Sequence, residues 1–142
     1  MTGCTEIRVR YVECDPMGVA HHTAYPVWFE IGRTELLRES GPAYRDLEQR
    51  GFLIAVVKLS VQYKQPARYD DLLLLQTSVT NVRRATINHA YELHRDGRLL
   101  ATACTTVVCL DRDGRPQPLP EELSAVSSQL SARKQSGDQP QG

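Results

Sequence analysis

The sequence lacks an excess of either charge, because seventeen Lys and Arg residues balance seventeen Asp and Glu residues. Domains that bind nucleic acid usually carry a surplus of basic residues, so this balance argues against such a partner. No apolar run approaches the roughly 20 residues that a membrane-spanning helix needs. The first ten residues, MTGCTEIRVR, also lack the apolar segment of a signal peptide. These absences favour a cytoplasmic protein that neither binds nucleic acid nor spans a membrane.

The four cysteines, Cys4, Cys14, Cys104 and Cys109, show no CxxC spacing, and no His-rich segment accompanies them. The pattern therefore argues against a zinc site. Cys104 and Cys109 fall in an apolar stretch, where cysteine behaves as a small hydrophobic residue. Cys14 precedes Asp15 and could be reactive, although a small, partly buried residue is the commoner role. We expect no bound metal.

The 142 residues suit one domain, with ordinary hydrophobic (41%) and charged (24%) fractions. We predict a single domain over residues 1–130 and a polar, disordered tail over 131–142. Residues 1–5 are also expected to be disordered. Strands are predicted at 6–13, 55–64, 72–82, 86–94 and 99–110. A long helix is predicted at 23–39, with shorter helices at 42–50 and 121–130.

The long helix has clear boundary signals, with Thr23 as a candidate N-cap and Gly41-Pro42 as a stop. Its apolar arc contains Trp28, Phe29, Ile31, Gly32 and Leu36, whereas Glu30, Arg33 and Arg38 fall mostly elsewhere. Gly32 suggests close approach to a sheet. Residues 55–64 alternate strictly, which predicts a half-buried strand. Asp96-Gly97 predicts a two-residue hairpin. The simplest packing is an α+β fold, in which an antiparallel sheet curls around the helix.

The segment from Arg8 to Tyr25 places a carboxylate between a strand and this helix. Asp15 precedes Pro16, which favours an extended conformation, and Gly18 supplies a flexible joint. Helix starts present unpaired backbone N–H groups and a partial positive charge. An aspartate beside a proline commonly caps a turn. The alternative is a catalytic base beside a cradle for an anion.

Several matches, spaced in order along the chain, resemble the hotdog-fold acyl-CoA thioesterases of the 4-hydroxybenzoyl-CoA thioesterase and YbgC-like family. They are Arg8-Val9, Cys14-Asp15, Gly18-Val19-Ala20, His21-His22, Tyr25, GRTELLR at 32–38 and VQYKQPARYDD at 61–71. The resemblance covers roughly residues 6–123. It implies a five-stranded sheet wrapped around one helix, a homodimer with its active site at the interface, and often a homotetramer.

The resemblance implies hydrolysis of acyl-CoA thioesters to free acid and CoA, a reaction that requires neither metal nor redox cofactor. Asp15 would act as a general base on water or attack the carbonyl as a nucleophile. Backbone amides near His22 would polarise the thioester carbonyl. For the His22 ring, a hydrogen bond to Asp15 or the substrate and a simple position at the helix entry are equally good explanations. For Tyr25, a buried aromatic is at least as good an explanation as substrate contact. The expected substrate-binding residues, including basic side chains for the CoA phosphates, are Gly18, Tyr25, Lys58, Lys64, Arg68, Arg83 and Arg84.

Alternative functions remain open on the sequence alone. The substrate could be a thioester of acyl carrier protein or 1,4-dihydroxy-2-naphthoyl-CoA. The chain could also bind acyl-CoA without hydrolysing it, because fold does not dictate function. Some hotdog enzymes carry their carboxylate on the central helix, but Glu35 lies deep in that helix, and we expect it to pair with an arginine. A hydratase is disfavoured, since Glu30 is the only near candidate for its early-helix carboxylate.

Overall fold

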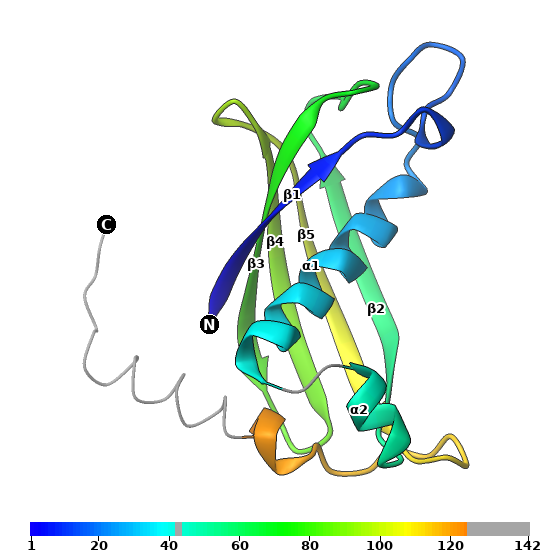
Figure 1. Ribbon diagram of the computed structural model, residues 1–142, viewed down its shortest axis with the longest axis vertical. Helices are drawn as coiled ribbons and strands as arrows, with labels where there is room; N and C mark the ends of the chain where they lie inside the picture. The colour runs from blue at the N-terminus through cyan, green and yellow to red at the C-terminus, as the bar shows by residue number, and fades with distance from the viewer. Residues whose placement is uncertain (42–43, 125–142) are drawn as a thin grey trace, which may run out of the picture.

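In the computed structural model, which describes residues 1–41 and 44–124, a five-stranded antiparallel sheet carries one long helix along one face (Figure 1). The elements are β1 (Thr2–Arg8), a 3₁₀ turn (Tyr11–Glu13), α1 (Ala24–Ser40), α2 (Tyr44–Gln49), β2 (Leu53–Tyr63), β3 (Leu72–Val82), β4 (Thr86–Arg95) and β5 (Arg98–Leu110). The strand order is β1-β3-β4-β5-β2. The predicted α+β architecture is confirmed.

Helix α1 makes its contacts with the sheet chiefly on β1 and β3, and Gly32 sets how close it comes. A Cβ atom added at Gly32 would lie 2.7 Å from Leu75 Cδ2 and closer still to Thr77 Oγ1. Side-chain carbon cannot occupy that space, so the predicted role of Gly32 is confirmed. Thr23 does precede the helix, but its side chain makes no capping hydrogen bond.

The core beneath α1 consists of two apolar clusters. The cluster under its N-terminal half includes Trp28 and Phe29, and the cluster under its C-terminal half includes Leu36 and Leu37. Alternate residues of β3, β4 and β5 point toward the helix, as the buried positions of each strand show. This inward face is apolar except where three polar side chains, Thr77, His89 and Thr105, are buried between the clusters.

Two boundaries at the N-terminus were predicted wrongly. Strand β1 begins at Thr2 and pairs with β3, so residues 2–5, expected to be disordered, belong to the strand that was predicted to begin at residue 6. Residues 11–13, expected in a strand, form the 3₁₀ turn. The alternation at 6–13 does not belong to one strand, because Val9 is buried whereas Tyr11 is 79% exposed.

The helix arc was also predicted incorrectly at two positions. Ile31, placed on the apolar arc, is 39% exposed, whereas Arg33, placed elsewhere, is only 8% exposed. An arginine is seldom buried without a charged partner, so pattern reasoning assigns it to the solvent face. In the structure, hydrogen bonds to the Tyr91 and Tyr44 hydroxyls accompany its burial.

Among the described residues, β2 is an edge strand that pairs only with β5. The half-buried alternation predicted for residues 55–64 is not observed, since Val57 and Leu59 are 61% and 41% exposed. Helix α1 does not cover this strand closely, and its second edge has no neighbour among the described residues of the chain. An apolar strand open on one edge and exposed on its faces is a surface suited to a partner.

The hairpin prediction at Asp96-Gly97 is confirmed, because both residues have positive φ between β4 and β5. Residues 121–124 are helical, and the remainder of the helix predicted at 121–130 lies outside the described residues, as does the predicted tail at 131–142. In the described part of the chain, no helix combines the length and apolar character that crossing a membrane requires.

Candidate active site

The loop before α1 is closed by backbone hydrogen bonds that fix the position of Asp15. The Asp15 N–H donates to the carbonyl of Val19 at 2.9 Å, and the Gly18 N–H donates to the carbonyl of Asp15 at 2.9 Å. Asp15 Oδ1 accepts from the N–H groups of Met17 and Val19 at 2.8 and 3.4 Å. Asp15 therefore caps its own turn. Its Oδ2 atom has no hydrogen-bond partner among the described residues and remains available to a reactant.

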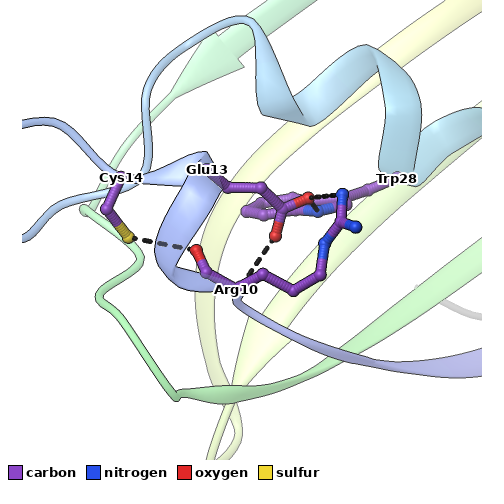
Figure 2. Close-up of polar contacts among 4 residues, drawn as sticks. All are labelled: Arg10, Glu13, Cys14 and Trp28. Atoms are coloured by element: carbon purple, nitrogen blue, oxygen red, sulfur yellow. Dashed lines mark hydrogen bonds and ion pairs between the residues drawn. The ribbon is translucent and has the colours of Figure 1, made fainter.

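Glu13 joins this loop to helix α1, and sequence reasoning missed it (Figure 2). Its carboxylate accepts from the Trp28 indole N–H at 2.9 Å, the Arg10 N–H at 2.8 Å and the Arg10 guanidinium at 3.2 Å. Burial by itself would raise the pKa of Glu13, but these hydrogen bonds and the charge of Arg10 lower it below its ordinary value. The Glu13 carboxylate also caps the start of the 3₁₀ turn, because it accepts from the N–H of Arg10, the residue that precedes the turn.

The backbone of Glu13 continues the same connection toward the helix start. Its carbonyl accepts from the His21 N–H at 2.7 Å. The next amide, the His22 N–H, donates to no group among the described residues. The His22 carbonyl instead accepts from the Tyr25 N–H at 3.4 Å and from the Tyr63 hydroxyl at 3.3 Å. A free N–H at a helix start is a donor suited to an oxyanion.

A surface hollow of about 300 Å³ is lined in part by His22, the residue that carries this free amide. Its lining brings together His22, Tyr25 and Lys64, which the sequence analysis selected, and it adds Tyr63. Tyr63 and Tyr25 meet edge to face with ring centroids 4.8 Å apart. The full lining is Ala20, His22, Tyr25, Tyr63, Lys64, Gln65 and Pro66. Asp15 is not part of it, but its loop borders the hollow, because Cys14 pairs with Ala20.

The remaining predicted binding residues lie at different distances from this hollow. Arg68 is near, since it pairs with Val19 of the Asp15 loop. Lys58 is exposed at the middle of β2. Arg83 and Arg84 follow β3 at the end of the sheet opposite the Asp15 loop (Figure 1). Within one chain, therefore, the structure brings Lys64 and Arg68 to the candidate site but not Arg83 and Arg84.

The segment that carries Arg68 is held by Asp71. The Asp71 carboxylate accepts from the Arg68 N–H at 2.8 Å and pairs with Arg95 at 2.7 Å. Burial opposes its charge, but these hydrogen bonds and the charge of Arg95 leave the pKa of Asp71 below its ordinary value. The segment on which Arg68 lies is therefore fixed to β4 through Arg95.

Cys14 and Glu35, which the sequence left as possible reactive groups, have structural roles. Burial and the neighbouring carboxylates, Asp15 first among them, raise the pKa of the Cys14 thiol, which donates to the Arg10 carbonyl at 3.6 Å. A protonated thiol is a poor nucleophile. Glu35 pairs with Arg38, so the ion pair predicted for it is confirmed. Within residues 1–41 and 44–124, no three His, Cys, Asp or Glu side chains are grouped as a metal site requires.

Comparisons with known proteins identify the family. A model described as the thioesterase-like superfamily matches residues 9–126. Acyl-CoA thioesterase YbgC of Haemophilus influenzae is 36% identical over 126 residues, which cover 87% of this chain and 93% of that protein. Acyl-CoA thioester hydrolase YbgC of Escherichia coli O6:H1 is 33% identical over 125 residues, with the same coverage of each. The structure of a DHNA-CoA thioesterase from Staphylococcus aureus superposes with a TM-score of 0.90 at 30% identity, covering 96% of this chain and 95% of that one.

The fold and the relatives thus define a thioester hydrolase of the hotdog class. More particularly, the chain belongs to the thioesterase-like superfamily. The resemblance to the hotdog acyl-CoA thioesterases that the sequence indicated is confirmed.

Proposed function

We propose that this enzyme hydrolyses acyl-CoA thioesters to free acid and CoA at the hollow beside the start of α1. The observation that supports this site best is the uncommitted His22 N–H, which lies next to the loop that orients Asp15. The thioester oxygen would accept from this amide. Developing negative charge on that oxygen is stabilised there by roughly 3 kcal/mol, the usual effect of one oxyanion donor.

Asp15 would supply the base or the nucleophile. As a base, its Oδ2 takes a proton from water while the water oxygen bonds to the thioester carbon, and the C–S bond then breaks to release CoA. As a nucleophile, Oδ2 bonds to that carbon, and the C–S bond breaks to release CoA and leave a mixed anhydride. Water then hydrolyses the anhydride to the free acid and the Asp15 carboxylate. The two Asx-turn hydrogen bonds hold Oδ1, so Oδ2 is the oxygen available for either reaction.

The CoA part would lie toward Lys64 and Arg68. Both residues belong to segments at the border of the hollow or of the Asp15 loop. Their charges would attract the CoA phosphates, and Tyr63 would cover the thioester. Lys58 does not line the hollow, and it would contact only a part of CoA that extended along β2 to the middle of that strand.

A homodimer through β2 would complete the site, and two dimers would give a homotetramer. The apolar residues of this edge strand are exposed in the single chain, and antiparallel pairing with a second β2 would cover them. Arg83 and Arg84 would contribute to CoA binding only from a second chain. The neighbour named for DHNA-CoA hydrolysis makes 1,4-dihydroxy-2-naphthoyl-CoA an alternative substrate. A thioester of acyl carrier protein is a second alternative, which no relative named here supports.

The test is turnover of Asp15→Asn on a panel of short, long and aromatic acyl-CoAs, with an acyl carrier protein thioester included. Asparagine retains the Oδ1 acceptor of the turn, so the loop is preserved while the base is removed. We expect kcat to fall by about a hundredfold or more. Asp111→Asn is the matched control, because Asp111 caps a similar turn, with the N–H groups of Asp113 and Arg115, at the far end of the molecule.

Unchanged turnover in Asp15→Asn would contradict the mechanism, and the absence of hydrolysis with every thioester would favour a binding protein. The two mechanisms are separated by a single turnover in H₂¹⁸O. Label entering the peptide that contains Asp15 would indicate the anhydride, because general-base attack of water on the thioester never labels the enzyme. Label confined to the released acid would exclude an anhydride that water opens at the Asp15 carbonyl.

A further inference from the structure

Arg33 is a buried cation that lacks an acidic partner. Its side chain lies under α1, and only 8% of the residue is exposed. Its guanidinium donates to the Tyr91 hydroxyl at 3.1 Å and also hydrogen-bonds Tyr44. Both partners are neutral, and no ion pair formed within the described residues includes Arg33. Arginine keeps its charge at every relevant pH, so the charge itself remains uncompensated.

Arg33 forms part of a polar belt that separates the two apolar clusters of the core. The belt consists of Arg33 on α1, Thr77 on β3, His89 and Tyr91 on β4, and Thr105 on β5. His89 is paired with Thr105 in the sheet, and Thr77 is paired with Tyr91. The Tyr91 and Thr105 hydroxyls hydrogen-bond each other at 2.6 Å.

Three atoms of this belt are buried without any hydrogen-bond partner: Arg33 Nε, Thr77 Oγ1 and His89 Nδ1. Arg33 Nε always carries a hydrogen, and the other two atoms are able to carry one. A buried polar atom without a partner is unfavourable, and three in one belt are unusual. The available groups are thus donors gathered around a positive charge.

A small hollow is lined by two of these residues, Arg33 and His89, but not by Thr77. Its volume is about 30 Å³, and apart from Arg33, His89 and Tyr44 its lining consists of apolar side chains such as Val79 and Ile87. This volume is enough for one or two water-sized occupants and too small for a phosphate or an acyl chain. Water would satisfy hydrogen bonds there but would leave the charge of Arg33 uncompensated.

We propose that this hollow binds one monatomic anion of the halide class, which accepts hydrogen bonds from Arg33 Nε–H and His89 Nδ1–H. The anion supplies the negative charge that the protein does not provide, and it completes the contact between α1 and the sheet. The site is separate from the thioester hollow, which none of its donors lines. The inference therefore does not depend on the proposed catalytic mechanism.

Two measurements on the intact protein test this proposal together. The first is a crystal structure in sodium bromide, with anomalous data collected at the bromine absorption edge. We expect an anomalous peak in hydrogen-bonding contact with Arg33 Nε. The second is the melting temperature in sodium chloride compared with sodium gluconate at equal ionic strength. We expect a saturable rise of roughly 5 °C with chloride.

Variants assign the effect to Arg33. Arg33→Met should abolish the chloride-dependent rise, whereas Arg38→Met, a change on the exposed face of the same helix, should retain it. If Arg33→Met does not fold, His89→Gln serves instead and should reduce the rise. Water or a carboxylate of a second copy at Arg33, with no anomalous peak, would overturn the proposal. A bromide peak without any chloride-dependent rise in melting temperature would also overturn the proposal, because it would mean binding at crystal concentration only.

Discussion

Glu13, which contacts helix α1, and Arg33, which lies on it, are both buried charged residues, yet their surroundings differ. Glu13 receives three hydrogen bonds, two of them from Arg10, which also supplies the opposite charge. Arg33 meets only hydroxyl groups and lies beside two further unpartnered atoms. A buried charge is compatible with stability when hydrogen bonds and an opposite charge replace its hydration. The comparison indicates that one chain supplies all the hydrogen bonds and the opposite charge that Glu13 needs at the loop end of α1. The belt near the middle of α1 instead requires an anion from solution to balance Arg33.

The largest expected effect comes from breaking the complete cluster. Glu13→Ala would leave the Trp28 indole N–H and the Arg10 N–H buried without their acceptor. We expect the free energy of unfolding, measured by urea titration, to fall by about 3 kcal/mol. Glu35→Ala is the control, because it removes an exposed ion pair and should cost less than about 1 kcal/mol. Equal losses in the two variants would contradict the structural role of Glu13.

A smaller effect is the pH dependence of stability, which differs between the cluster of Glu13 and the belt that contains Arg33 and His89. Burial, assisted by the charge of Arg33, lowers the pKa of His89 from 6.5 to about 3. His89 is therefore neutral in the folded protein, whereas the unfolded chain binds a proton below pH 6.5. Its contribution to stability is complete above pH 6.5 and is lost as the pH falls toward 3. Glu13, whose pKa is lowered from 4.5, loses its contribution only below that pH.

Between pH 6.5 and 5, the free energy of unfolding should accordingly fall by roughly 1 kcal/mol per pH unit in halide-free buffer. In His89→Gln this slope should largely disappear. The measurement is urea unfolding at a series of pH values. A slope that persists in the variant would assign the effect to another group.

The smallest expected effect is the change in stability of Arg33→Met in sodium gluconate. Methionine fills similar space without a charge, and replacing an unpaired buried charge by an apolar side chain is often neutral or stabilising. We expect the free energy of unfolding to change by less than about 1 kcal/mol, in contrast to Glu13→Ala. A loss as large as that of Glu13→Ala would mean that the hydroxyl partners of Arg33 already compensate its charge.

Much of the fold was predictable because its signals are local. The helix stop at Gly41, the Asp96-Gly97 hairpin and the strand ranges of β3 and β4 depend on residues close in sequence, and each was predicted correctly. The role of Gly32 was also predictable, since glycine lowers helix stability and is retained in mid-helix chiefly where a neighbouring element comes close. The first half of β1, residues 2–5, was missed because an edge strand owes its existence to its neighbour, β3, which is distant in the chain.

The candidate site was predictable only in part. The order of Asp15, Gly18, His22 and Tyr25 marks the loop and the family. Tyr63 and Glu13 were not found, because their relevance depends on contacts with His22 and Trp28 across long sequence separations. Arg83 and Arg84 were selected by charge and by their place near a strand end, and the direction of β3 places them at the opposite end of the sheet.

The sequence by itself determined the elements, their turns, the carboxylate loop and the family, because these depend on local conformational preference and on the spacing of residue types. Only the tertiary structure decided which charges are paired. Burial and hydrogen bonding depend on distances between segments that the chain brings together from afar. For that reason the completed cluster of Glu13 and the uncompensated charge of Arg33 became visible only in three dimensions.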